Sequence, residues 1–371
     1  MGLIRRILGT SSKHYRLNAL VSCRRAEREL ESALHHHIVC DLDKTYVETE
    51  FESWVKMARI PFEKAHEKVT VAGAGEVLQE LRWGSPKVDH ISSPRMGLHF
   101  VSSSPPQLRA VLEGKLILDG LDWSTDTFKN QTYNLRMARI DLLRHHIAYK
   151  AKAILDLAAV FPEGATFWLI GDNAEYDPFV YAALKAFLCE QIDVTGLSEW
   201  LSAAGVERNV VDQVLLGTEG LQGKSLVCGG IFIRKLQGYP VIEAPPLTSS
   251  IVLFESWLQI AWILFLDGLL SSSSMWRLIR GFHNQYGISL SHVSWAINDF
   301  LSTHRDLSAP VASGIDDVVK KLSSCEIIER KCYGWTFKNR IIPAENNSQV
   351  LNYGALAKGW YRDIERSKRP K

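Results

Sequence analysis

Two aspartates that flank a leucine, Asp41 and Asp43, are the first residues in this sequence whose types and spacing could do chemistry. They follow the short apolar run 37–40, which predicts a buried strand. At a strand-to-loop turn, both carboxylates can point into one crevice. One of them can attack phosphorus, while the other protonates the leaving oxygen and then activates water. The alternative is a loop that carries two solvated aspartates.

Three serines before a proline, Ser102, Ser103 and Ser104, end a second predicted strand over residues 97–101. A hydroxyl and the neighbouring backbone N–H groups can hold a phosphoryl oxygen at such a position. Ser102 comes first after the strand, but the register is open by one or two residues. A simple Ser-Pro turn is the alternative interpretation.

A third pair of polar residues, Asp172 and Asp177, follows a strand predicted over residues 165–170. Mg²⁺ prefers oxygen ligands and keeps several waters, so one or two carboxylates together with a phosphate suffice to bind it. A lysine near the phosphoryl group would offset the negative charge. Lys150 and Lys152, in the helix predicted over 139–160, are both candidates for that role.

The elements that must position these residues alternate between strand and helix. This alternation predicts an α/β domain with a mainly parallel sheet, in which side chains at the carboxyl ends of the strands converge on one crevice. Helices are further expected near 107–113 and 178–188 and as two segments within 51–82, whereas residues 114–135 are expected to be irregular.

Composition and charge restrict the class of protein. Apolar residues make up 46% and charged residues 23% of the 371 residues, and the net charge is +2. A strong overall attraction to nucleic acid is therefore not expected. The six cysteines contain no CxxC pair, which argues against a disulfide framework and a zinc site. The apolar stretch 251–270 contains charged residues and predicts a buried core helix rather than a membrane span.

The pattern divides the chain into three parts. Residues 1–33 are expected to be a basic amphipathic helical segment, and residues 34–240 the α/β domain with an insertion over 190–224. Residues 241–371 are expected to form a mostly helical accessory domain. A winged-helix-like module with a role in nucleic-acid binding is the alternative for this last part, and we regard nucleic acid as the less favoured partner.

Taken together, these motifs resemble the haloacid dehalogenase-like hydrolases. More narrowly, they resemble the catalytic domain of the actin-patch-associated phosphatidate phosphatases and their bacterial relatives. The resemblance rests on a DxDxT motif, a serine turn before proline, and a lysine followed at fixed spacing by Ile, Leu and Phe-Pro and then by a Gly-Asp motif. Here these are Asp41–Thr45, Ser102–Pro105, Lys150, Ile154, Leu157, Phe161–Pro162 and Gly171–Tyr181.

The resemblance implies a Rossmann-like sheet with a minimal cap, continued by a later strand over 229–234, and a role for each motif residue. Asp41 would be the nucleophile, Asp43 the acid and base, and Ser102 a phosphate ligand, and the alignment selects Lys150 over Lys152. One Mg²⁺ would be bound by the Asp41 side chain, the Asp43 backbone carbonyl, Asp172 and waters. Asp177 would steady a metal-bound water or Lys150.

The expected function is Mg²⁺-dependent hydrolysis of a phosphomonoester, either phosphatidate or another large substrate. A non-catalytic scaffold on the same fold and a phosphotransferase with an acceptor other than water are the alternatives. The sequence departs from the family at Asn173-Ala174-Glu175 and at Lys44. These departures keep all the metal ligands, but they weaken the inference that the substrate is a lipid. A cytoplasmic protein, at most peripheral to a membrane, is expected.

Overall fold

Six parallel strands and one antiparallel edge strand form the central sheet of the computed structural model, which describes residues 19–23, 33–48, 64–84, 94–104, 108–129, 139–239 and 251–287. Only the backbone is described for residues 19–23 and 139–145. The strands lie in the order β1 (Ala19–Cys23), β6 (Thr125–Lys129), β5 (Gly97–Ser102), β2 (His36–Cys40), β7 (Thr166–Asp172), β8 (Val227–Arg234) and β9 (Ile251–Phe254). Only β1 runs antiparallel to its neighbour. The predicted α/β fold with a parallel sheet is confirmed.

The strands separate two hydrophobic cores because successive side chains point to opposite faces of a sheet. In β2, Ile38 and Cys40 lie in one core, whereas Val39 lies in the other. Both faces are buried, which is typical of parallel sheets. Complete burial of each such aliphatic side chain contributes roughly 1.5–3 kcal/mol.

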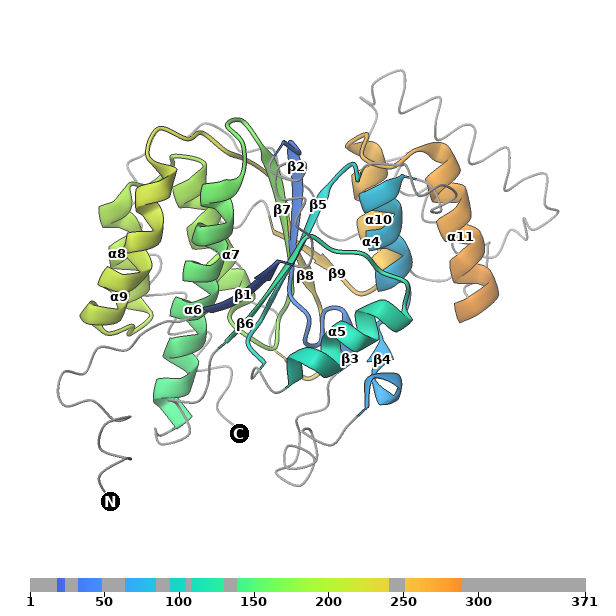
Figure 1. The fold of residues 1–371 in the computed structure, drawn as a ribbon, viewed down its shortest axis with the longest axis horizontal. Coiled ribbons are helices and arrows are strands. Elements are labelled where there is room, and N and C mark those ends of the chain that lie inside the picture. Colours follow the sequence, from blue (N-terminus) through green and yellow to red (C-terminus); the bar gives the residue numbers. More distant parts are fainter. Residues whose placement is uncertain are drawn as a thin grey trace.

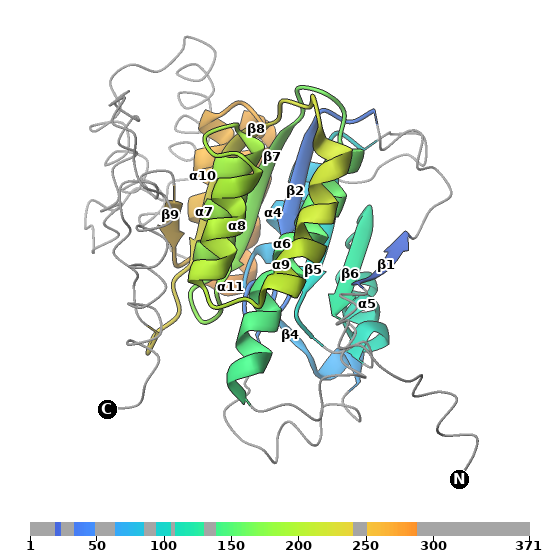
Figure 2. The same ribbon diagram turned by 90° about the vertical axis from the view of Figure 1, so that its left-hand side faces the viewer.

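Helices cover both faces of the sheet (Figures 1 and 2). One layer consists of α6 (Arg139–Val160), α7 (Asp177–Leu188), α8 (Val194–Ala203) and α9 (Arg208–Leu215). The opposite layer consists of α4 (Ala74–Trp83), α5 (Arg109–Leu118), α10 (Trp257–Leu266) and α11 (Ser272–Tyr286). In Figure 2 the α6–α9 layer lies in front of the sheet, with β1 and β9 at opposite edges.

The segment between the first two motifs, residues 46–96, forms no separate domain in its described residues, 46–48, 64–84 and 94–96. Its residues form a hairpin, β3 (Val47–Glu48) and β4 (Val69–Thr70), a short 3-10 helix (Ala65–Glu67) and helix α4, which packs in the main core. Residues 190–224, the expected insertion, form α8, α9 and a 3-10 helix (Leu216–Leu221), which pack beside α6 and α7. The described residues thus agree with a minimal cap.

The expectation of an irregular segment over 114–135 is wrong. Helix α5 continues to Leu118, and Thr125–Lys129 form strand β6 between β1 and β5. Strand β6 has a polar sequence, Thr-Asp-Thr-Phe-Lys, so it lacks the apolar run by which other strands were predicted. Its buried Asp126 is stabilised by hydrogen bonding from Trp123 and by an ion pair with Arg109, so that tertiary contacts make a polar strand possible.

The two ends of the chain differ from the expected division. Residues 19–23 are a strand rather than part of a helix, because they pair with the edge of β6. Residues 1–18 and 24–32 lie outside the described residues. Residues 251–287 are mostly helical as expected, but β9 joins the sheet and α10 and α11 share the main core. They are therefore continuous with the α/β domain. Residues 288–371, including the suggested winged-helix region, lie outside the described residues.

Helix α10 is the buried core helix expected within 251–270. Ser256 and Gln259 form a capping box at its start, which satisfies otherwise unpaired backbone N–H groups. Among the described residues, no helix is both long and apolar enough to cross a bilayer.

Candidate active site

Asp41 and Asp172 lie side by side at the carboxyl ends of two adjacent parallel strands. Asp41 follows directly after β2, and its backbone N–H donates to the carbonyl of Ile170 in β7 at 2.9 Å. Asp172 is the last residue of β7. Both carboxylates are fully buried. Strand pairing therefore brings together two carboxylates that are separated by 131 positions in the sequence.

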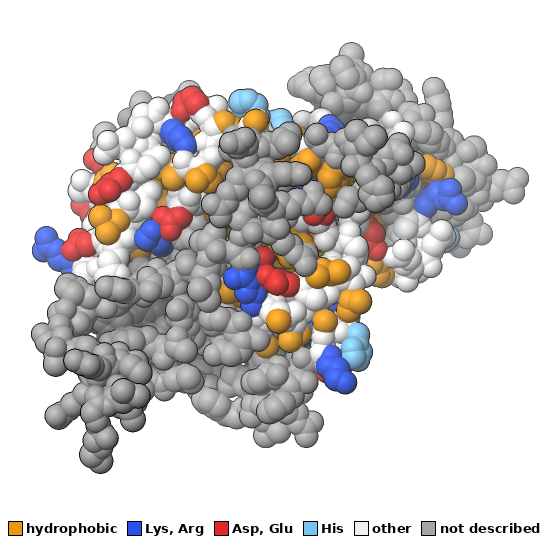
Figure 3. Space-filling model, viewed as in Figure 1, with side chains coloured by type: hydrophobic (Ala, Val, Ile, Leu, Met, Phe, Trp, Pro, Cys, Tyr) orange, Lys and Arg blue, Asp and Glu red, His pale blue; other side chains and the backbone are white. Residues whose placement is uncertain are grey.

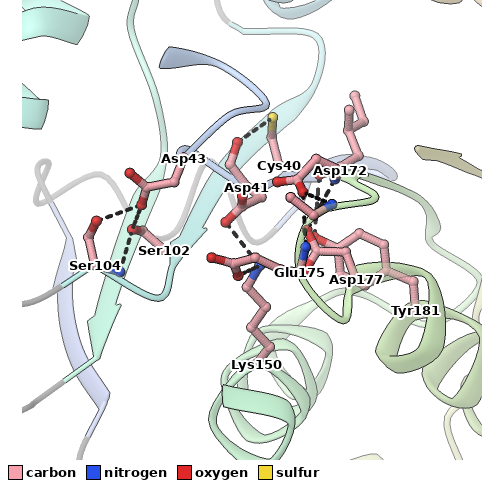
Figure 4. A network of polar contacts seen from close by, with 12 residues as sticks. Cys40, Asp41, Asp43, Ser102, Ser104, Lys150, Asp172, Glu175, Asp177 and Tyr181 are labelled. Atoms are coloured by element: carbon pink, nitrogen blue, oxygen red, sulfur yellow. Dashed lines mark hydrogen bonds and ion pairs between the residues drawn. The ribbon is translucent and has the colours of Figure 1, made fainter. Parts of the chain in front are cut away.

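Lys150 of α6 lies at the centre of the carboxylate group (Figure 4). Its Nζ is 3.1 Å from Oδ1 of Asp41 and 2.9 Å from Oε2 of Glu175, and it also contacts Asp177. Lys152, the competing candidate, instead pairs with Asp156 one turn along the same helix. The structure thus places Lys150 beside the predicted nucleophile and Lys152 outside the site.

Burial and mutual repulsion control the protonation of this group. Burial raises the pKa of Asp41 and that of Asp177, and it raises the pKa of Asp172 to about 7 with the help of the neighbouring charges of Asp177 and Glu175. Burial alone would lower the pKa of Lys150, but Asp177, Asp41 and Glu175 together raise it well above its ordinary value. Lys150 is therefore protonated, and its positive charge stabilises the ionised carboxylates around it.

Asp43 lies apart from this group and contacts the serine turn. Its Oδ2 accepts a hydrogen bond from Ser102 Oγ at 2.9 Å and one from Ser104 Oγ at 2.6 Å. The backbone N–H of Ser104 also donates to Ser102 Oγ at 3.0 Å. The serine turn thus orients the second aspartate of the DxDxT motif. A contact between any of the three serines and phosphate stays a prediction.

The turn that carries Asp41 and Asp43 is held by residues far along the chain. Lys44 adopts a left-handed conformation with φ of 60°, which is unusual for a residue with a side chain. Arg234 of β8 donates to the Lys44 carbonyl at 2.5 Å, and Trp257 Nε1 of α10 donates to the Thr45 carbonyl at 3.2 Å. The Lys44 side chain donates to the hydroxyl of Tyr239 at 2.9 Å. These contacts stabilise a turn that its own sequence does not favour.

The loop after β7 is shaped by its two aspartates. Asp172 Oδ1 accepts hydrogen bonds from the backbone N–H groups of Ala174 and Glu175, at 2.6 and 3.1 Å. Asp177 Oδ2 accepts one from the N–H of Asp172 at 3.3 Å. A Cβ atom on Gly171 would lie 2.3 Å from Asp177 Oδ2, so only glycine permits this close approach.

Three of the candidate carboxylates can supply oxygen atoms to one cation. Carboxylate oxygens of Asp41, Asp172 and Asp177 all lie within 4.8 Å of one another. Oδ2 of Asp41 and Oδ2 of Asp172 are buried without a hydrogen-bond partner in the described part of the chain. Buried oxygens of this kind suit a hard divalent cation. The side chain of Asp43 is not part of this group, and a role for its backbone carbonyl stays a prediction.

Glu175 and Arg234 are site residues that the sequence analysis did not assign. Glu175 contacts Lys150, and its position between two candidate aspartates could have indicated this. Arg234 binds both the Lys44 carbonyl and Glu48, with a shortest ion-pair distance of 2.6 Å. It is the last residue of β8, so its position at the carboxyl edge of the sheet was the available signal.

Comparison with known proteins supports the resemblance drawn from the motifs. Residues 36–195 match the family model described as phosphatidate phosphatase APP1, catalytic domain, which confirms the suspected similarity over that segment. The matched residues include the predicted nucleophile, the serine turn, Lys150 and the Asp172 loop. No curated protein and no solved structure matches the chain.

Proposed function

We propose that this protein is a Mg²⁺-dependent phosphatase that hydrolyses phosphomonoesters through an aspartyl phosphate on Asp41. The observation that carries the proposal is the buried group at one edge of the sheet: Asp41 and Asp177 contact Lys150, and together with Asp172 they offer oxygens within 4.8 Å of one another. The match to a phosphatase catalytic domain over residues 36–195 supports it.

Asp41 and Asp43 would divide the chemistry between them. A carboxylate oxygen of Asp41 forms a bond to phosphorus as the bond to the ester oxygen breaks, and Asp43 gives its proton to that oxygen. In the second step water attacks the phosphorus, Asp43 takes up a proton from it, and Asp41 is released with inorganic phosphate. The hydrogen bonds from Ser102 and Ser104 hold Asp43 in one orientation for both transfers.

Lys150 would support the reaction electrostatically. Its Nζ lies 3.1 Å from Asp41 and remains protonated, because three carboxylates raise its pKa. A fixed positive charge in a buried site stabilises the negative charge that develops on the phosphoryl oxygens, at no cost of reorganisation during the reaction.

The residues present fit the metal that the family resemblance implies. Asp41 and Asp172 would hold Mg²⁺ through their unpaired oxygens, with the Asp43 carbonyl as a further ligand. Asp177 would hold Lys150 and the Asp172 backbone in place, as its contacts do already. A bound Mg²⁺ supplies Lewis acidity to the phosphoryl oxygens.

A phosphate displayed on a large molecule, with phosphatidate as the first choice, is the substrate that we propose. The described residues between the first two motifs form no lid domain. Exposed apolar side chains also occur in this region: Thr70 donates to Asp119 at 2.5 Å, and the residues that precede these two in the sequence, Val69 and Leu118, are both exposed. Tyr46 of the turn donates to the same carboxylate. This surface suits contact with a lipid interface and a peripheral association with a membrane in the cytoplasm.

Charge does not favour a nucleic-acid partner. On the face that Figure 3 shows, acidic and basic side chains of the described residues are interspersed rather than gathered by sign. The net charge of the whole chain is only +2. Nucleic-acid binding depends on a concentrated basic surface.

The test is a comparison of turnover on three substrates with Mg²⁺ present: a small aryl phosphate, a soluble sugar phosphate and phosphatidate in vesicles. We expect release of inorganic phosphate, fastest from vesicles. Asp41→Asn is the matched control for contaminating phosphatases. A preference for the sugar phosphate would contradict the open site, and absence of phosphate release from all three would contradict the phosphatase proposal.

A further inference from the structure

Lys129, the last residue of β6, lies at the same edge of the sheet as the site residues. In the parallel pair of β5 and β6, Phe128 is opposite Ser102, the residue that contacts Asp43. Phe128 points into the core that includes α4 and α10. Because successive side chains alternate, Lys129 points to the other face, which is covered by α6 and its Lys150.

The ammonium group of Lys129 is buried without a partner. The side chain is 3% exposed, and its Nζ forms no hydrogen bond within the described part of the chain. Burial lowers the pKa of Lys129 to about 7, and the charge of Glu175 acts in the opposite direction. Glu175 is the residue that contacts Lys150, so Lys129 lies within electrostatic reach of the site.

Two hydroxyl groups near Lys129 and Lys150 are unpaired as well. Thr127, two positions before Lys129, and Tyr149, the neighbour of Lys150 in α6, each bury a hydroxyl oxygen without a hydrogen-bond partner in the described structure. A buried polar group that lacks a partner destabilises the folded protein, so such groups usually bind a ligand or water. Thr127 and Lys129 share the face of the sheet that α6 covers, and Tyr149 belongs to α6 and lies in the core on that face. Unpaired donors from both elements point to an anionic ligand.

The charges of the site favour the same conclusion. The site contains five carboxylates, those of Asp41, Asp43, Asp172, Glu175 and Asp177. Lys150 contacts three of them, Asp41, Glu175 and Asp177. A phosphomonoester dianion must enter beside them. One Mg²⁺ and Lys150 together supply three positive charges, so a further cation would reduce the repulsion between substrate and site.

We propose that Lys129 is a second anion-binding residue of this site, whose ammonium group donates hydrogen bonds to the oxygens of a bound phosphate or phosphoryl group. The proposal rests on the phosphatase function proposed above. It assigns to the end of β6 a part in substrate binding, and it assigns to the Thr127 and Tyr149 hydroxyls a supporting role in the same contact.

Binding of inorganic phosphate to the full-length chain tests this without turnover. The dissociation constant is measured by calorimetry with Mg²⁺ for the wild type, Lys129→Met, Lys129→Arg and Lys152→Met. Lys152 is the matched control, because it is a lysine of α6 that pairs with Asp156 outside the site. Losing a charge-assisted hydrogen bond should weaken phosphate binding by about tenfold or more in Lys129→Met. Lys129→Arg should restore most of it, and Lys152→Met should leave it unchanged.

Thermal unfolding separates binding from structure. Because the Lys129 ammonium is unpaired, Lys129→Met should unfold at the same temperature as the wild type or a higher one. Wild-type phosphate affinity in Lys129→Met, or loss of its fold, would overturn this proposal alone. Failure of the wild type itself to bind phosphate or release it from any ester would overturn the phosphatase proposal as well.

Discussion

Lys150 Nζ lies 3.1 Å from Oδ1 of Asp41, and both groups are buried. The same ammonium contacts Glu175 and Asp177, so a single positive charge compensates three carboxylates. Loss of one partner from a buried ionic group leaves the others without compensation, which costs more than the intact group contributes. Lys150 is therefore both a stabilising residue and a candidate for catalysis.

Lys150→Met should destabilise the protein as well as inactivate it. Removing the one lysine leaves three carboxylates in close contact, and the free energy of unfolding should fall by about 3–5 kcal/mol. Urea unfolding without metal measures this. Lys152→Met, which breaks a more exposed pair with Asp156, should cost about 0–1 kcal/mol. Equal effects of the two substitutions would mean that the buried ionic group is not formed in solution.

Asp41→Asn and Asp43→Asn should affect turnover differently. Loss of the nucleophile in Asp41→Asn should reduce kcat by about 10⁶-fold, the scale found when an essential nucleophile is removed. Asp43→Asn should reduce it by about 10²–10⁴-fold by slowing both proton transfers. Rapid-quench detection of phosphoprotein distinguishes them, because only Asp43→Asn should still form the aspartyl phosphate. Phosphoprotein on Asp41→Asn would assign the nucleophile elsewhere.

Mg²⁺ should stabilise the folded protein through Asp172. A ligand that binds only the folded state raises the unfolding temperature, so Mg²⁺ should raise that of the wild type. Asp172→Asn should lose this shift while remaining at least as stable without metal, because burial and neighbouring charges make its ionised form unfavourable. Asp156→Asn is the matched control and should keep the shift. An equal shift in Asp172→Asn would place the cation elsewhere.

A buried histidine chain at the opposite end of the sheet should contribute stability that is lost in acid. His37 Nε2 must donate to the Leu34 carbonyl at 2.7 Å, so His37 Nδ1 accepts from His99 Nε2 at 3.1 Å. Burial lowers the pKa of His37 to about 4 and that of His99 well below its ordinary value. Both rings therefore stay neutral in the folded protein.

The pKa of His37 is about 4 in the folded protein and 6.5, the ordinary value, in the unfolded chain. At a pH between these two values, the unfolded chain binds a proton at His37 and the folded protein does not. Stability from this residue is thus fully present above pH 6.5 and declines as the pH falls, by roughly 2 kcal/mol at pH 5. Asp172, with a pKa raised to about 7, contributes in the opposite direction over the same range. The His37 contribution is therefore measured as the difference between the wild type and His37→Phe in urea unfolding at pH 7 and pH 5. His37→Phe should reduce the pH dependence, whereas substitution of exposed His66 by Gln should not.

The sequence predicts the strands that carry the motifs because each is a short apolar run that ends in polar residues. It also predicts that Asp41, Ser102 and Asp172 meet, since parallel strands share a carboxyl edge. Strand β6 was missed because its residues are polar and are made acceptable only by contacts such as that between Arg109 and Asp126. Strand β9 and helices α10 and α11 were expected in a separate domain, because the local sequence of β9 does not indicate that it pairs with β8.

Within the site, the residue types at the strand ends were predictable, but their partners were not. The choice between Lys150 and Lys152 needed a family resemblance, since both lie on one helix and only its rotation relative to the sheet separates them. The contacts of Glu175 with Lys150 and of Ser104 with Asp43 depend on side-chain directions in loops. Helical or strand periodicity does not determine such directions.

The hydrogen bonds that hold the motif turn also determine when the site can form. Arg234 and Trp257 donate to the carbonyls of Lys44 and Thr45, which lie 190 and 212 positions away in sequence. Closing such large loops is entropically costly and slows folding. During synthesis, the turn that bears the nucleophile stays incomplete until residue 257 has left the ribosome. A growing chain would therefore acquire its reactive geometry only after strands β2 to β8 have been synthesised.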